Sequence, residues 1–543
     1  MKIIRLYQSL LFLFLLQSIG VGFSVSLAHS ETPPNILLLV ADDLGYGDLG
    51  IYGGDIHTPN VDKLAGNGLL FTQFHTAPYC APTRAMLLSG NNNHIAGMAA
   101  QHATGLMRDY VPGYERYLSN RIVPFPRLLR ESGYNTFSVG KWHLGTTKKH
   151  DPKAAGFTRS FNLLHGAANH FNSIGFYGEG SIYHEDGEEV DYPKGSFSTK
   201  VYTDKLIEFI KDHKDEGKPF FGFAAYTAPH WPLQVPTDYL YKYRGAYDMG
   251  YDRLRTLRFE SLKSAGIIPA SSKLPPRNEA ITPWTMLTSK EKQREARKME
   301  LYAAMIDNLD FHIGRLIEFM KKEGLYENTL IIFMADNGAA GEDFYHKGPF
   351  VEYIQAQYDN TYENMGKATS WVSYGPQWAE AGSAPFSRYK GYAREGGIVA
   401  PLIISGPGVA HGNSKTSCYA TVMDIAPTLL GIAGARYPND GNVKPMLGES
   451  MVELLRGKND YVHENDYVTT LYHRGHALIR QGQWKLVTLE PPFDESKFEL
   501  FNLKDDPGET VNLATKKADR YSAMIDLWRR KRMELGIILP QDL

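Results

Sequence analysis

Four apolar runs, each ending abruptly in polar side chains, constrain the fold of this chain more than any other feature. They span residues 35–41, 134–140, 219–226 and 329–335. The last three follow segments of helical character at 123–131, about 200–211 and about 291–322. Strands that alternate with helices predict an α/β fold with a large, mostly parallel sheet flanked by helices. Continuously apolar strands are typical of a sheet that is covered on both faces.

The residues that follow these runs predict a binding site along one edge of the sheet. They are Asp42-Asp43, Lys141 with His143, His230, and Asp336-Asn337. A single acidic pair after a strand is usually a loop or a helix cap. However, the carboxyl ends of strands in an open α/β sheet line the ligand crevice. Four such endings that gather carboxylates, a lysine and imidazoles therefore indicate a functional site.

The stretch 79–90 places a cysteine in an unusual setting. Pro82 suits the first turn of a helix, and Gly90 can end that helix. Cys80 would then lie at a helix N-terminus, where backbone N–H groups favour an anion or a nucleophile. Arg84, one turn later, adds a cation on the same face. Taken alone, the stretch is equally compatible with a small structural cysteine at a helix start.

The remaining segments predict two domains after the first 30 residues, a large one over 31–459 and a small C-terminal one over 460–543. Short strands at 468–472, 477–480, 484–487 and 498–501 predict an antiparallel meander, followed by a helix over about 517–535. The segments 242–297 and 341–382 are predicted to be irregular insertions near the rim of the site. Their aromatic residues could shape substrate access or pack in the interior.

Charge and cysteine content limit the possible functions. The 543 residues carry a formal net charge of -2, which argues against a nucleic-acid binder. The only cysteines are Cys80 and Cys418. The second has no charged neighbour, and we interpret it as structural. A Cys80–Cys418 disulfide is an open alternative.

The N-terminus resembles a secretory signal peptide over residues 1–30. Lys2 and Arg5 precede an apolar core at 10–16, and cleavage after Ala28 or Ser30 fits the small residues there. We therefore expect export to the periplasm or secretion. The apolar run is short for a membrane span, so we expect no stable membrane insertion, although an uncleaved anchor stays open.

A series of short motifs resembles the type I sulfatases of the alkaline phosphatase superfamily, and among them the bacterial arylsulfatases. The first is Cys80-x-Pro82-x-Arg84 with Ser89-Gly90. The others occur in the family's order at 41–45, 140–145, 228–232, 336–338, 389–391, 395–397 and 503–509. The resemblance runs from Pro34 to Asn512 and covers nearly the whole chain.

This resemblance implies a modified nucleophile and a metal ion. In the family the cysteine is oxidised to formylglycine (3-oxoalanine) by a formylglycine-generating enzyme, and here that residue would be Cys80. One calcium ion would be held by Asp42, Asp43, Asp336, Asn337 and modified Cys80. Oxygen ligands alone would also admit magnesium or manganese.

The resemblance also implies catalytic roles. Arg84 would fix the modified residue, while Lys141 and Lys390 would hold the sulfate oxygens. Asp336 would accept a proton from the attacking hydroxyl. His230 would stabilise or protonate the leaving oxygen, and His143 would take the proton that allows sulfate to depart. His94 and His170 are left without a role, and Trp231 is expected to form a pocket wall.

The expected activity is that of an arylsulfatase-like hydrolase, which cleaves small-molecule or carbohydrate sulfate esters to an alcohol or phenol and inorganic sulfate. Two other functions remain open. One is a phosphatase or phosphonate monoester hydrolase of the same superfamily. The other is an exported sulfated-glycan binder that lost catalysis, although no catalytic residue of the family pattern is missing here.

Overall fold

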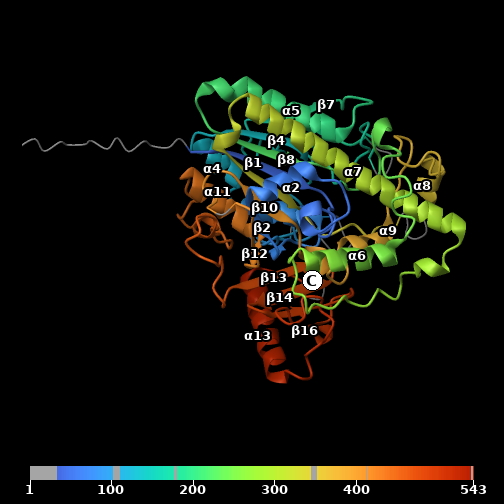
Figure 1. Ribbon diagram of the computed structural model, residues 1–543. Coiled ribbons are helices and arrows are strands. Elements are labelled where there is room, and N and C mark those ends of the chain that lie inside the picture. The colour runs from blue at the N-terminus through green and yellow to red at the C-terminus, as the bar shows by residue number, and fades with distance from the viewer. Residues whose placement is uncertain are drawn as a thin grey trace, which may run out of the picture. The chain divides into compact units, whose positions relative to one another are not determined.

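A ten-stranded sheet forms the centre of the computed structural model (Figure 1). The structure describes residues 33–101, 111–175, 180–343, 351–410, 412–539 and 542. The strand order is β11-β2-β10-β9-β1-β8-β4-β5-β6-β7. The strands are β1 (Asn35–Ala41), β2 (Gly68–Phe71), β4 (Asn135–Lys141), β5 (Arg159–Leu163), β6 (Tyr183–Glu185), β7 (Glu188–Val190), β8 (Phe220–Ala225), β9 (Thr329–Ala335), β10 (Leu402–Ser405) and β11 (Ser414–Thr416). The signal peptide predicted for residues 1–30 lies outside the described residues.

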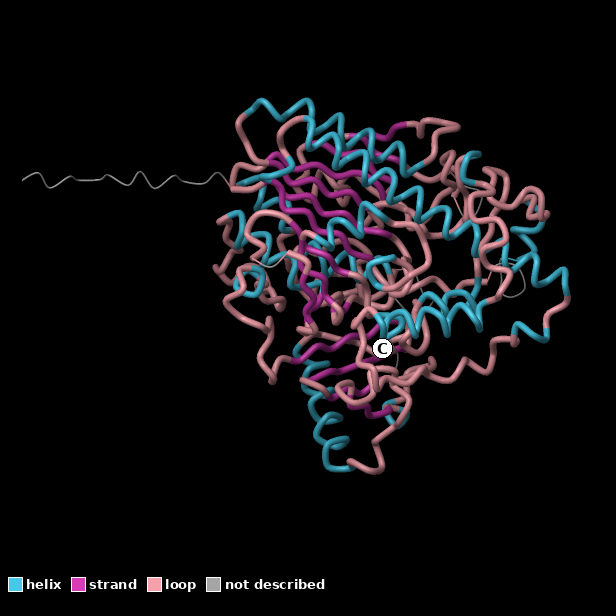
Figure 2. Tube along the Cα trace, viewed as in Figure 1, coloured by secondary structure: helices cyan, strands magenta, loops and turns pink. Residues whose placement is uncertain are grey.

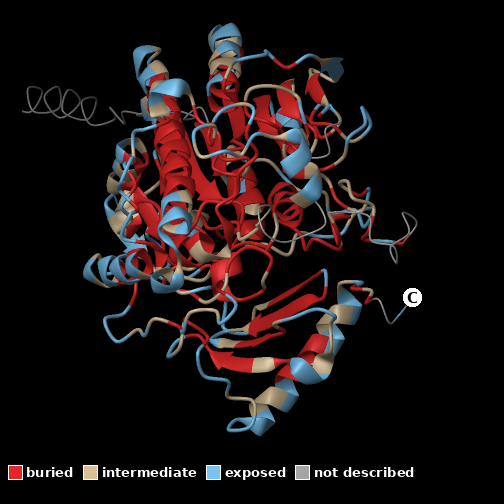
Figure 3. Ribbon diagram, turned by 90° about the vertical axis from the view of Figure 1, so that its right-hand side faces the viewer, coloured by how far each residue is buried: buried red, intermediate tan, exposed pale blue. Residues whose placement is uncertain are grey.

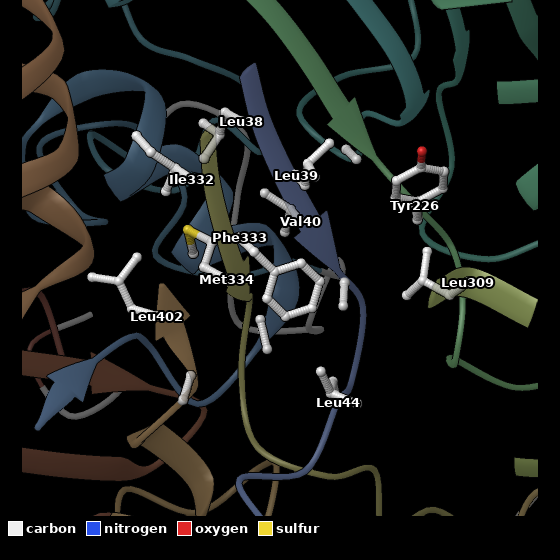
Figure 4. Packing of buried hydrophobic residues seen from close by; sticks show 14 of the residues in the cluster. Leu38, Leu39, Val40, Leu44, Tyr226, Leu309, Ile332, Phe333, Met334 and Leu402 are labelled. Atoms are coloured by element: carbon white, nitrogen blue, oxygen red, sulfur yellow. The ribbon is translucent and has the colours of Figure 1, made fainter. Parts of the chain in front are cut away.

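The middle of this sheet is parallel, as predicted. Strand β1 pairs in parallel with β8 and β9, and β4 pairs in parallel with β8 and β5. Strand β10 is antiparallel to both of its neighbours, and the edge strands β6 and β7 are antiparallel. Every residue of β1 and β9 is buried. Figure 4 shows side chains of these two strands, such as Leu39, Val40 and Phe333, packed together.

Helices cover both faces of the sheet (Figure 2). Phe221 of β8 packs on Phe125 of α4, whereas a side chain at Gly222 would meet Leu206 of α5. Because successive strand residues point to opposite faces, α4 and α5 lie on opposite sides. The helices are α2 (Pro59–Gly66), α3 (Cys80–Ser89), α4 (Phe125–Glu131), α5 (Ser198–His213), α6 (Tyr251–Ser264), α7 (Ser289–Lys322), α8 (Val351–Gln357), α9 (Gly375–Gly382), α10 (Glu395–Ile398), α11 (Ile425–Ala433), α12 (Val452–Leu455) and α13 (Ala518–Glu534).

A separate four-stranded antiparallel sheet lies near the C-terminus of the sequence (Figure 3). It consists of β13 (Val468–His473), β14 (His476–Gln481), β15 (Trp484–Val487) and β16 (Glu499–Asn502). Trp528 of α13 is fully buried in an apolar cluster with Ile479 and Leu500 of this sheet. These elements match the predicted meander and helix. The division into domains at residue 459 stays a prediction.

The predicted irregular insertions are partly wrong. Helix α6 lies within 242–297, and α8 and α9 lie within 341–382. Helix α6 was missed because its buried stripe includes Arg255 and Arg258 beside Leu254 and Leu262, so that the apolar spacing is interrupted by charge. The strands β3 (Phe74–His75) and β12 (Ala420–Thr421) form a further two-stranded pair that the sequence did not reveal.

Two further observations concern the cysteines and the membrane. Cys80 and Cys418 are both free thiols, so the structure contains no Cys80–Cys418 disulfide. In the described part of the chain, none of the helices combines the length and apolar character that a bilayer crossing requires.

Candidate active site

The polar residues that follow the strands meet at one place, as the sequence predicted. Asp42 and Asp43 follow β1, Lys141 ends β4, and Asp336 follows β9, and all four are completely buried. Asp43 has a backbone φ of 66°, a left-handed conformation uncommon for a residue other than glycine. Its backbone N–H donates to Asp336 Oδ1 at 3.2 Å, which joins two neighbouring strand ends.

Cys80 is the first residue of α3 and faces the two aspartates. Its Sγ lies 3.3 Å from Asp42 Oδ1 and 3.7 Å from Asp43 Oδ1. Tyr79 before it is extended, and Gly90 ends the helix with a φ of 64°. Burial, together with the negative charges of Asp336 and Asp42, raises the pKa of the Cys80 thiol well above its usual value. An unmodified Cys80 is therefore a protonated thiol and a poor nucleophile.

Arg84 connects the cysteine helix to two strand ends. Its Nε and Nη2 both donate to Asp336 Oδ2, at 3.1 and 2.9 Å, and its Nη1 donates to the Lys141 carbonyl at 2.8 Å. Burial and the nearby charge of Asp42 raise the pKa of Asp336 to about 6, against the opposing effect of Arg84. The guanidinium is itself 1% exposed, so its charge is poorly screened by water.

Two lysines neutralise the outer oxygens of the aspartate pair. Lys141 Nζ lies 2.7 Å from Asp42 Oδ2, and Lys390 Nζ lies 2.8 Å from Asp43 Oδ2. Lys390 is also 3.5 Å from Glu342 Oε1. Burial opposes the charge on Lys390, but Asp43 and the neighbouring negative charges, Glu342 and Asp42 among them, together outweigh it and raise the pKa of the lysine. Burial likewise opposes ionisation of Asp43, yet Lys390 and His230 hold the pKa of Asp43 below its usual value.

The two predicted catalytic histidines occupy different positions. His230 Nε2 lies 3.4 Å from Asp43 Oδ2, and its Nδ1 is 2.7 Å from the Trp231 carbonyl, which fixes Nδ1 as the N–H donor. Burial lowers the pKa of His230 well below its usual value. His143 follows Lys141 closely, with a φ of 61°, and its ring lies against Gly166, where a side chain would collide with it.

The histidines that the sequence left without a role have structural surroundings. His170 is buried, with Nδ1 2.7 Å from Ser198 Oγ and Nε2 3.2 Å from the His230 carbonyl. It therefore supports the loop that carries His230, a relationship that no spacing in the sequence indicates. His94 is packed against Tyr114 and Tyr472 instead of facing the site.

The residues present fit a hard divalent cation. Ligand atoms of Asp42, Asp43, Cys80 and His230 lie within 4.8 Å of one another. Asn337 Nδ2 donates to Asp43 Oδ1 at 2.6 Å, while its Oδ1 is buried and has no hydrogen-bond partner among the described residues. An unsatisfied buried amide oxygen beside converging carboxylate oxygens is the donor chemistry that such a cation requires. His230 joins this group, whereas the Asp336 oxygens are already bound by Arg84 and the Asp43 N–H.

The chain is similar to known proteins in sequence and in fold. A family model described as Sulfatase matches residues 34–435, and one described as N-sulphoglucosamine sulphohydrolase, C-terminal, matches residues 389–533. An uncharacterized sulfatase of Schizosaccharomyces pombe is 38% identical, over 94% of this chain and 95% of that protein. An arylsulfatase of Klebsiella aerogenes is also 38% identical, over 79% of this chain and 94% of its own. The solved structure of Ps i-CgsB in complex with k-i-k-neocarrahexaose superposes with a TM-score of 0.64 at 23% identity, over 93% of each chain.

Proposed function

The chain belongs to the sulfatase family and is a sulfatase, and from that premise we propose that it hydrolyses sulfate monoesters with a formylglycine made from Cys80 and a bound divalent cation. The observation that carries the proposal is the orientation of the aspartate pair. Both Oδ1 atoms face the Cys80 side chain, while both Oδ2 atoms are held by lysines. A protonated thiol donates only weakly to these carboxylate oxygens, at 3.3 and 3.7 Å, whereas a hydroxyl group would bond to them more strongly, which supports a group with oxygen chemistry at this position.

When present, the aldehyde hydrate at residue 80 supplies the attacking oxygen, and calcium supplies positive charge for the sulfate oxygens. Asp42, Asp43 and Asn337 would hold the cation together with the oxygen at residue 80. Asp336 would be a further ligand, as the sequence predicted. Magnesium and manganese remain possible with these ligands.

The charged side chains would bind and orient the sulfate group. Lys141 and Lys390 are buried and keep their charge because aspartates face them. A sulfate oxygen that displaces part of this pairing gains a strong, poorly screened attraction. Arg84 holds Asp336 and the Lys141 backbone in place, so it keeps the nucleophile and the sulfate site in register.

Three groups would move protons. The raised pKa of Asp336 makes it a better acceptor for the proton of the attacking hydroxyl. His230 would stabilise or protonate the leaving oxygen; burial lowers its pKa and keeps it neutral in the free protein, so proton delivery would require a bound anionic substrate to raise that pKa. His143, on the loop after Lys141, would accept the proton whose loss releases sulfate.

The proposal includes two substrate classes, a maturation enzyme and a location for the protein. The arylsulfatase relative supports aryl sulfates as substrates, and sulfated sugars are the second class to test. Maturation would require a formylglycine-generating enzyme. The sequence of residues 1–30 supports export, to the periplasm or the medium.

The test is a comparison of 4-nitrophenyl sulfate with 4-nitrophenyl phosphate on the calcium-loaded protein. We expect kcat/KM to favour the sulfate by at least about 100-fold, equivalent to about 2.7 kcal/mol of transition-state stabilisation. The Lys390→Gln variant should lose activity on the sulfate. A preference for the phosphate would instead identify the protein as a phosphatase or phosphonate hydrolase.

A further inference from the structure

A cavity lies beside the loop that follows Lys141, on the α4 side of the sheet. Its volume is about 430 Å³, within the range of sites for small organic ligands. Trp142, which lies between Lys141 and His143 in the sequence, forms part of its wall. The Trp142 indole N–H donates to the His150 carbonyl at 2.7 Å, so the wall is fixed in place.

The acidic residues of this cavity already have partners within the fold. Glu115 is paired with Arg121 at 2.5 Å and accepts the Gly113 N–H at 2.8 Å. Asp151 accepts the Ala154 N–H at 2.9 Å and lies 3.0 Å from His184 Nδ1. Glu115 is therefore offset by Arg121, and both oxygens of Asp151 are engaged in hydrogen bonds within the fold.

The basic residues of the same cavity are not neutralised. Arg127 donates one N–H to the Ala154 carbonyl at 2.8 Å, and Lys149 is exposed. Within the described part of the chain, neither has a carboxylate partner at ion-pair distance. The cavity thus presents a guanidinium fork and an ammonium group to whatever enters it, a combination that binds carboxylates and sulfates.

The other lining groups fit a sugar ring. Tyr117 and His150 are stacked with ring centroids 3.6 Å apart and form an aromatic surface. Asn120 adds an exposed polar side chain that can bond to hydroxyl groups, whereas the buried Ser119 hydroxyl already donates to the Ile95 carbonyl at 2.8 Å. An aromatic surface combined with neutral hydrogen-bonding groups is poorly suited to a bare inorganic anion.

We propose that this cavity binds one negatively charged monosaccharide unit, with its anionic group at Arg127 and Lys149 and its ring against Tyr117. The site is separate from the lysines that would bind the scissile sulfate. The inference does not depend on the formylglycine chemistry, because binding can be measured without turnover.

The test uses the calcium-loaded full-length protein and two probes, glucuronic acid and uncharged methyl glucoside, titrated by saturation-transfer NMR. We expect glucuronic acid to bind at least about tenfold more tightly, a difference of about 1.4 kcal/mol. The Arg127→Gln/Lys149→Gln variant should bind the two sugars equally. The matched control is Arg253→Gln/Lys273→Gln, which removes the same charge from exposed residues outside the cavity and should keep the preference.

Three results would overturn the proposal: equal binding of both sugars to the unaltered protein, a preference that survives the double substitution, or a control variant that loses the preference as well. If the double variant fails to fold, Lys149→Gln alone decides the matter. Lys149 is exposed and makes no ion pair within the described part of the chain, so its replacement should not unfold the protein and an unchanged preference in that variant counts against the site.

Discussion

Lys485, on β15 of the C-terminal sheet, places its Nζ 2.6 Å from Oε1 of Glu395, the first residue of α10. The same ammonium lies 2.8 Å from Glu509 Oε1, and Glu395 Oε2 lies 2.9 Å from His75 Nε2. His75 precedes Cys80 by five residues, and Glu395 follows Lys390 by five. The buried charges therefore connect the C-terminal sheet to the segments that lead into and out of the active site.

Replacing Lys485 with Met should destabilise the protein strongly. The substitution leaves Glu395 and Glu509 buried without their shared cation, a loss of about 3–5 kcal/mol of unfolding free energy. Denaturant unfolding measures it. Lys497→Gln is the control, since Lys497 is exposed and its pair with Asp494 spans 3.7 Å, so it should change the free energy by less than about 1 kcal/mol. Equal stabilities of the two variants would show that Lys485 does not connect these parts.

Replacing Cys80 with Ala should abolish turnover of 4-nitrophenyl sulfate while the fold stays intact. Alanine cannot be oxidised to the aldehyde, and the small side chain creates no clash at the start of α3. Cys80→Ser should be nearly inactive unless the host also oxidises serine. Cys418→Ala is the matched control and should retain activity, because the Cys418 thiol bonds to backbone groups of Tyr419 and Val462 and is not among the active-site residues. Activity in the alanine variant would refute the proposed nucleophile.

Stability should fall as the pH drops below about 6.5, the pKa of histidine in an unfolded chain. Burial lowers the pKa of His94 to about 3 and that of His170 to about 4. The unfolded state therefore binds protons that the folded state does not bind, so the free energy of unfolding rises with pH in this range. Each histidine should lower the free energy of unfolding by about 2 kcal/mol as the pH falls from about 7 to about 5.

Urea unfolding at a series of pH values measures this loss, and His94→Phe should reduce its slope because phenylalanine can pack between Tyr114 and Tyr472 without titrating. An unfolding free energy that stays constant from about pH 7 to pH 5 would contradict the neutral, buried state assigned to these histidines.

Removal of divalent cations should inactivate the protein and lower its melting temperature. Without a cation, the Oδ1 atoms of Asp42 and Asp43 face each other's charge, although Lys141, Lys390 and the Asn337 amide offset part of it. A cation at 100 times its dissociation constant would add about 2.7 kcal/mol of stability. We expect calcium to restore both activity and melting temperature after chelation. If calcium raises the melting temperature of the Asp43→Asn variant as much as that of the unaltered protein, this ligand set is wrong.

The sequence predicted which polar residues would lie together because strand ends and helix starts are local features. The runs before Asp42 and Asp336 are continuously apolar, and the carboxyl ends of parallel strands must meet at one edge. The alternation of strands and helices also predicted the parallel centre of the sheet. In each case a short-range pattern and a topological rule were sufficient.

Other features depend on contacts that no local pattern records. Helix α6 is charged along its buried face because Arg258 lies 2.5 Å from Asp48 and 2.7 Å from Asp55, which compensates its burial. The support of His230 by His170 joins residues 60 positions apart. The contact between Lys485 and Glu395 joins residues 90 positions apart. These arrangements follow from the assembled fold and were therefore not predictable from spacing.

The most direct test of the central claim is the mass of the peptide that carries residue 80, measured on active protein from its native host. The account predicts an aldehyde at this position that is captured by a hydrazide reagent, with turnover rising in proportion to the modified fraction. Fully active protein with an intact Cys80 thiol would contradict it.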